Sequence, residues 1–108
     1  METLRAANNY AMTLLRQKRF TEVKRLLRKV APVARRALGA EHALTLSLRE
    51  DLSRATLDGE SSAEEKRDAL RTLEDVAAVM RRVLGPAHPD TLHAQGKLKF
   101  YRRKFPGA

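Results

Sequence analysis

The feature that most restricts the fold of this chain is a nine-residue motif that occurs twice. The sequence LGAEHALTL, which begins at Leu38, returns 46 residues later as LGPAHPDTL, which begins at Leu84, and five of the nine positions are identical. The Thr-Leu pair of the motif also occurs at Thr3, 42 residues before Thr45. A self-similarity with a period of this length is typical of proteins that stack copies of one supersecondary unit. We therefore expect a repeat protein whose units pack mainly against their neighbours.

Each copy of the motif is interpreted as a junction between two helices. Gly39 and Gly85 follow apolar segments that end in arginine pairs and one more apolar dipeptide. A glycine closes a helix in a left-handed conformation, and the arginines favour the negative end of the helix dipole. Further along, Asp90 or Thr91 can cap the free amides of the next helix. The histidine of each junction is assigned a capping or packing role rather than a catalytic one.

Outside the junctions the apolar residues follow a helical period. Val23, Leu26, Leu27 and Val30, for example, recur at steps of three and four, which predicts one apolar helix face. We expect five antiparallel helices and no strand, with breaks near Lys18, Gly39, Gly59 and Gly85.

Several residues before the first junction resemble the tetratricopeptide repeats of kinesin light chains and related proteins. Asn9-Tyr10-Ala11 with Leu14, followed by Leu26-Leu27, is similar to the family's first and second helices, and the junction motif is similar to its helix-to-helix turn. The resemblance implies an all-α fold, a right-handed α-solenoid of antiparallel helix pairs in a single domain, 1–108. Its parts would be repeat 1 at about 3–44, repeat 2 at about 45–90 with an acidic loop at 58–66, and a C-terminal capping helix at 91–105.

The chain departs from the family pattern in the middle. Residues 58–66 form an acidic stretch where the family has a short turn, so Gly59 is expected in an exposed, flexible loop. Substitution of Gly59 by alanine should then matter less than substitution of Gly85 by valine. Ser61 or Ser62, with a glutamate three residues later, has the spacing of a capping box that would begin the fourth helix. Pro32 lies inside the second helix, where a kink or a cost of about 3 kcal/mol is expected.

A concave groove lined by the first helix of each pair is the predicted binding surface. Stacked helix pairs leave such a surface, and it presents side chains at regular spacing to an extended or helical segment. By resemblance, Asn9 faces this groove and hydrogen-bonds a bound peptide. The groove is expected to be polar, mainly basic and exposed, and therefore to suit an acidic protein partner or a subunit of a complex. Its predicted residues are Arg5, Asn9, Thr13, Arg16, Ser47, Asp51, Arg54, His93 and Lys97.

A second basic surface offers an alternative. A stripe on the second helix lies opposite its apolar face and consists of Arg25, Arg28, Lys29, Arg35 and Arg36. The chain has a formal net charge of +9, which attracts anions at long range. On this hypothesis the protein is a small basic structural subunit of a larger assembly that contacts RNA or an anionic membrane surface, and nucleic-acid binding would depend strongly on salt.

The sequence contains no pattern that predicts catalysis. It has no cysteine, so disulfides, thiolate zinc sites and a cysteine nucleophile are excluded. It also lacks a glycine-rich phosphate loop and a His/Asp/Glu set with the spacing of a metal site. No apolar run is long enough to span a membrane. We therefore expect a non-catalytic module without metal or cofactor. The compartment stays open, with the cytoplasm as default and an organelle as the alternative.

Overall fold

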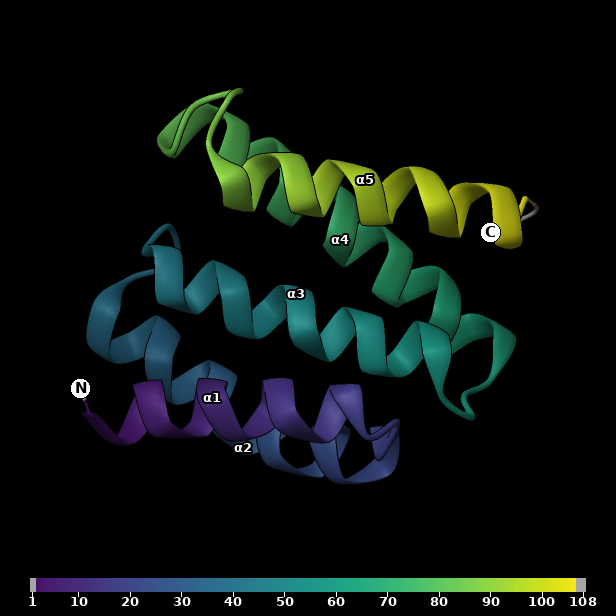
Figure 1. The fold of residues 1–108 in the computed structure, drawn as a ribbon, viewed down its shortest axis with the longest axis horizontal. Helices are drawn as coiled ribbons and strands as arrows, with labels where there is room; N and C mark the ends of the chain where they lie inside the picture. Colours follow the sequence, from purple (N-terminus) through teal and green to yellow (C-terminus); the bar gives the residue numbers. More distant parts are fainter. Residues whose placement is uncertain (1, 107–108) are drawn as a thin grey trace.

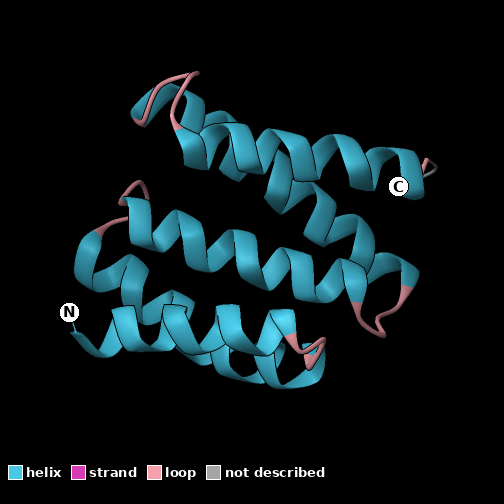
Figure 2. Cartoon of the chain, viewed as in Figure 1, coloured by secondary structure: helices cyan, strands magenta, loops and turns pink. Residues whose placement is uncertain are grey.

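The computed structural model describes residues 2–106, which contain five helices and no strand. The helix breaks coincide with Lys18, Gly39, Gly59 and Gly85, as the sequence predicts, and the connecting loops are short (Figure 2). The all-α prediction is confirmed. The helices are α1 (Glu2–Arg16), α2 (Phe20–Leu38), α3 (Ala43–Asp58), α4 (Ala63–Val83) and α5 (Pro89–Lys104).

The five helices form two layers. Helices α1, α3 and α5 run in the same direction in the front layer of Figure 1, while α2 and α4 return behind them in the opposite direction. Helix α3 is central, because it contacts each of the other four helices. An array of this kind is an α-solenoid, in which one layer presents the first helix of every pair.

The buried core is divided into two clusters that share α3. One cluster packs α1 and α2 against α3 and includes Leu14, Leu27 and Leu48. The other packs α4 and α5 against α3 and includes Leu46 and Leu73. Because α3 is covered on both sides, polar residues along it are buried together with its leucines.

Histidines, and not the predicted aspartate or threonine, cap the helices that follow the two junctions. The Nδ1 atom of His42 accepts a hydrogen bond of 3.1 Å from the Leu44 amide, and His88 Nδ1 accepts one of 3.1 Å from the Asp90 amide. The prediction of Asp90 or Thr91 as the cap is therefore wrong, since both lie inside α5, after Pro89. An imidazole in the extended residue before the helix satisfies an amide that would otherwise lack a partner.

The connection between α3 and α4 is shorter than predicted. It comprises only 59–62, and 63–66 form the first turn of α4. The helix begins there because Ser62 and Glu65 form a capping box: Ser62 Oγ accepts from the Glu65 amide at 3.0 Å, and Glu65 Oε1 accepts from the Ser62 amide at 3.1 Å. Of the two serines that fit the spacing, Ser62 is the cap.

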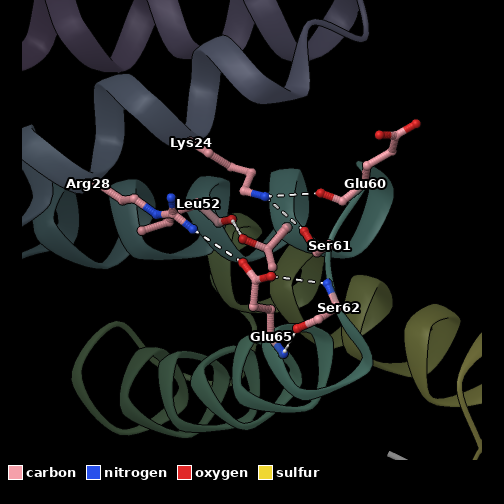
Figure 3. Close-up of polar contacts among 8 residues, drawn as sticks. Lys24, Arg28, Leu52, Glu60, Ser61, Ser62 and Glu65 are labelled. Carbon is pink, nitrogen blue, oxygen red and sulfur yellow. Dashed lines mark hydrogen bonds and ion pairs between the residues drawn. The ribbon is translucent and has the colours of Figure 1, made fainter.

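Two basic residues of α2 hold this connection in place (Figure 3). Lys24 Nζ donates to the Glu60 carbonyl at 3.2 Å and to Ser61 Oγ at 2.9 Å. One turn further, Arg28 Nη2 lies 3.4 Å from Glu65 Oε2. The contacts join segments far apart in the sequence, so the connection is tied to α2.

The prediction that Gly59 is exposed and flexible is also wrong. A Cβ atom built on Gly59 would lie 2.7 Å from Phe20 Cβ and 2.8 Å from the Ala55 carbonyl oxygen. The end of α3 therefore packs closely on the start of α2, and only a residue without a side chain fits. Pro32, by contrast, leaves α2 continuous; its ring is exposed, where water can satisfy the carbonyl that loses its amide partner.

Candidate functional site

An open groove of about 830 Å³ lies along the helices of the front layer. Helices α1, α3 and α5 all contribute to it, and the ends of α2 and α4 complete it through Leu38 and Met80. Six predicted residues line it, two from α1, three from α3 and one from α5. These are Arg5, Asn9, Ser47, Asp51, Arg54 and His93.

Three predicted residues are not among those that line the groove: Thr13, Arg16 and Lys97. Thr13 Oγ1 donates to the Asn9 carbonyl within α1 at 3.2 Å, so its hydroxyl is used inside its own helix. Arg16 is the last residue of α1. Lys97 lies one turn beyond His93 on α5. The loss of two of these residues removes positive charge that the prediction assigned to the groove.

The groove walls combine hydrogen-bonding and apolar side chains. Asn9 is exposed on α1, and Asn8 Oδ1 accepts from Ser47 Oγ at 3.4 Å, which links α1 to α3. Met12 and Leu44 add apolar surface between these groups. A protein segment could therefore find both backbone partners and small apolar contacts in the groove.

The floor of the groove is acidic, which corrects the prediction of a mainly basic surface. Glu50 and Asp51 both line it and are only 5% and 4% exposed. Asp90 adds a third carboxylate at the start of α5, while Arg5 and Arg54 are the arginines that line the groove. Arg54 is also not exposed as predicted, since its side chain retains only 18% of its accessible surface.

Glu50 is held by a histidine from the neighbouring helix. His93 Nδ1 lies 2.8 Å from Glu50 Oε2, and the bond joins α3 to α5. Burial raises the pKa of Glu50, while the charges of His93 and Arg54 oppose this shift. Glu50 is not among the predicted groove residues. The available signal was an acidic pair, Glu50-Asp51, set among the leucines at 46, 48 and 52.

The carboxyl group of Asp51 has little compensation from neighbouring positive charge or hydrogen bonds. Its Oδ1 atom lies 4.0 Å from Arg54 Nη1. Among the described residues, Asp51 Oδ2 and Arg54 Nε have no hydrogen-bond partner. Burial, and then the nearby charge of Glu50, raise the pKa of Asp51 to about 7. The floor of the groove therefore holds a carboxyl group with unused hydrogen-bonding capacity.

The alternative basic stripe lies in the other layer. All five of its residues are exposed, and none of them lines the groove. Arg28 pairs with Glu65, whereas the other four form no ion pair with any residue between 2 and 106. These are Arg25, Lys29, Arg35 and Arg36.

Two further properties of the described residues bear on function. None of the five helices is both long and apolar enough to cross a membrane. Between residues 2 and 106, no three His, Cys, Asp or Glu side chains are grouped so that they could hold a metal ion.

Comparison with known proteins identifies a family. The model of the tetratricopeptide repeat family matches residues 3–44 and 60–90, which together make up more than half of the chain. Both matched segments end within a junction motif, and the unmatched residues include most of α3 and most of α5. No curated protein and no solved structure shows a significant match.

Proposed function

Because the chain belongs to the tetratricopeptide repeat family, whose repeats mediate protein–protein interaction without catalysis, we propose that it binds an extended segment of a partner protein in the groove between α1, α3 and α5. The observation that carries the proposal is the groove itself, which three parallel helices line with polar groups of both hydrogen-bonding types. Such a surface suits a chain whose backbone amides and carbonyls need partners.

The overall charge favours an acidic partner. A net charge of +9 attracts acidic proteins at long range and raises the rate of encounter. Within the groove, Arg5 on α1 is the exposed arginine that an acidic side chain of the segment can reach, whereas the carboxylates of the floor repel one. On this proposal the bound segment carries its acidic residues toward Arg5 on α1.

Site-specific photocrosslinking tests this proposal. A photoreactive amino acid replaces Asn9 in one variant and Arg25 in a second, and each variant is irradiated in extract from the cells that make the protein. We expect position 9 to crosslink to a defined segment of a partner, identified by mass spectrometry, and position 25 to give no crosslink to that segment. Both positions are exposed, so the two variants should fold equally well.

The same experiment examines the alternative. The four unpaired basic residues of the α2 stripe favour a structural subunit that contacts an anionic surface. Crosslinks to protein or RNA from position 25, together with none from position 9, would contradict groove binding and support that alternative.

A further inference from the structure

We propose that Glu50 and Asp51 form a seat for one cationic side chain of the bound segment, a lysine ammonium or an arginine guanidinium. The inference rests on the proposed function, because it states which chemistry the groove floor recognises. A site that binds a cation is not expected from the charge of the whole chain, which is +9.

The burial of the two carboxyl groups is the first argument. Each is more than nine-tenths buried, although the groove opens above them. Removing a carboxylate from water is costly unless a cation or several hydrogen bonds replace the water. Two adjacent carboxyl groups on one helix add mutual repulsion to that cost. A site with this composition gains most from a positive group.

The protein itself supplies too little positive charge at this point. His93 contacts Glu50 at 2.8 Å and leaves Asp51 untouched. Arg54 approaches Asp51 Oδ1 only to 4.0 Å, and Asp51 Oδ2 has no partner among residues 2–106. Asp90, which also lines the groove, adds negative charge that acts on Glu50.

A lysine or arginine side chain supplies the missing positive charge. It reaches the two carboxyl groups through the small part of their surface that stays open to the groove, since Asp51 Oδ2 itself is buried. It donates several hydrogen bonds from one charged group, and its aliphatic stem can lie along the apolar wall formed by Met12 and Leu44. A neutral donor, such as a backbone amide, would satisfy one oxygen without compensating the charge. The floor therefore selects a segment in which one basic residue is set among acidic ones, because a wholly basic segment is repelled by the rest of the molecule.

Capped tripeptides test the seat independently of any natural partner. The probes are Ac-Gly-Lys-Gly-NH2 and Ac-Gly-Arg-Gly-NH2, with the norleucine and glutamate analogues as controls, titrated into the millimolar range at constant ionic strength. Binding is followed by NMR through the His93 ring and the amides of Glu50 and Asp51. We expect the lysine and arginine peptides to bind about tenfold more tightly than the norleucine peptide, the ratio that one partly buried charge contact produces.

A matched pair of double variants assigns the effect to the groove. Glu50→Gln with Asp51→Asn should reduce the preference for lysine over norleucine to about twofold or less, since no carboxylate is left in the seat. Glu64→Gln with Asp68→Asn changes the net charge by the same amount at exposed positions of α4 and should leave the preference intact. The lysine-to-norleucine ratio in the unmodified protein stands even if the first double variant fails to fold.

Three outcomes would contradict the proposed cation seat. They are equal binding of the norleucine and lysine peptides, tighter binding of the glutamate peptide, and no NMR shift with either cationic peptide. These results leave groove binding itself untouched, because that proposal is decided by the crosslinks from position 9. Conversely, crosslinks from position 25 alone would contradict the proposal of groove binding. A measured preference for the lysine peptide would still be valid in that case.

Discussion

Lys18 occupies a backbone position that normally belongs to glycine. It is the one non-glycine residue with positive φ (59°) between residues 2 and 106. There it ends α1 in a double hydrogen bond, from the Lys18 amide to the Leu15 carbonyl at 3.0 Å and from the Arg19 amide to the Leu14 carbonyl at 2.9 Å. This pattern is the Schellman motif, in which a side chain at the left-handed residue is strained.

Lys18→Gly should therefore raise the free energy of unfolding by about 0.5–1 kcal/mol, because it removes the steric conflict of the Cβ atom in the left-handed region. Urea denaturation at constant pH measures the effect. Gln17→Gly serves as the control and should lower stability, since Gln17 does not have positive φ and gains only flexibility in the unfolded chain. A decrease for Lys18→Gly would show that the lysine side chain contributes a contact that outweighs its strain.

Alanine substitutions at two glycines in different surroundings should have opposite effects on stability. Gly59→Ala should lower the free energy of unfolding by at least about 1 kcal/mol, because its Cβ would press on Phe20 and on the Ala55 carbonyl. Gly96→Ala should raise it by about 1 kcal/mol, because Gly96 lies within α5 and a Cβ there meets nothing within 4 Å. Thermal melts of both variants measure the difference, and the same sign for both would contradict the packing at Gly59.

Asp51 should make stability depend on pH. Its pKa is raised to about 7 in the folded protein by burial and by Glu50, against the weaker opposing effect of Arg54. Between the ordinary aspartate pKa near 4 and pH 7, the folded state keeps a proton that the unfolded chain releases, so stability falls as the pH rises through this window. The loss attributable to Asp51 is about 4 kcal/mol at most.

Asp51→Asn should flatten this dependence, because the amide does not titrate. Urea denaturation of both proteins from pH 4 to pH 8 measures the free energy of unfolding. The stability of the variant relative to the natural sequence should rise steadily as the pH increases. Glu50 still titrates in the variant, so a reduced slope stays. Parallel curves for the two proteins would mean that Asp51 ionises normally in the folded state.

At the scale of helices and loops, the contact between α2 and the α3–α4 connection has a measurable consequence. Lys24→Ala removes both hydrogen bonds to Glu60 and Ser61 and should cost about 1 kcal/mol. Hydrogen exchange at the amides of 60–62 should accelerate as the connection loosens. Lys29→Ala on the same helix is the control and should change neither quantity, since Lys29 is exposed and forms no ion pair with the described residues. Equal effects of the two substitutions would argue against the anchor.

The helices and their breaks could be predicted because the signals for them are local. A glycine with positive φ after an apolar run, as at Gly39 and Gly85, ends a helix wherever it lies in the fold. Gly59 was misjudged because its requirement comes from Phe20, a residue far away in the sequence. For the start of α4, two serines fit the capping-box spacing, while the predicted loop extends to residue 66. Only the structure shows that Ser62 forms the box and that the helix begins at Ala63.

The groove was predicted better in its position than in its charge. The family resemblance placed Asn9 in the groove, and the register of the repeats then placed Ser47 and His93 on the same surface, because the first helix of each pair repeats in the same orientation. The acidic floor depends on how deeply α3 is buried between α2 and α4, and no periodic pattern reports that depth. Consequently the prediction of an exposed Arg54 is wrong, and the sequence pattern does not indicate Glu50.

For the whole molecule, the separation of the groove from the α2 stripe predicts different kinetic roles. Reversal of Arg25, Lys29 and Arg35 to glutamate should lower the association rate for an acidic partner by about tenfold or more at low salt and leave the dissociation rate nearly unchanged, since these residues act only through long-range attraction. Surface plasmon resonance against the crosslinked partner measures both rates. A large increase in the dissociation rate would place the stripe in the contact surface.

Helix α3 supplies leucines to both core clusters, and its polar side forms the floor of the groove. When α3 unfolds, each cluster loses the α3 side chains that bury it on one side. Neither half of the molecule therefore keeps a buried core without α3. We therefore expect the chain to unfold as one cooperative unit, although its repeated sequence would suggest two separable ones. If a segment binds in the groove as proposed, it should stabilise both halves together, by an amount that grows with the logarithm of its concentration relative to its Kd.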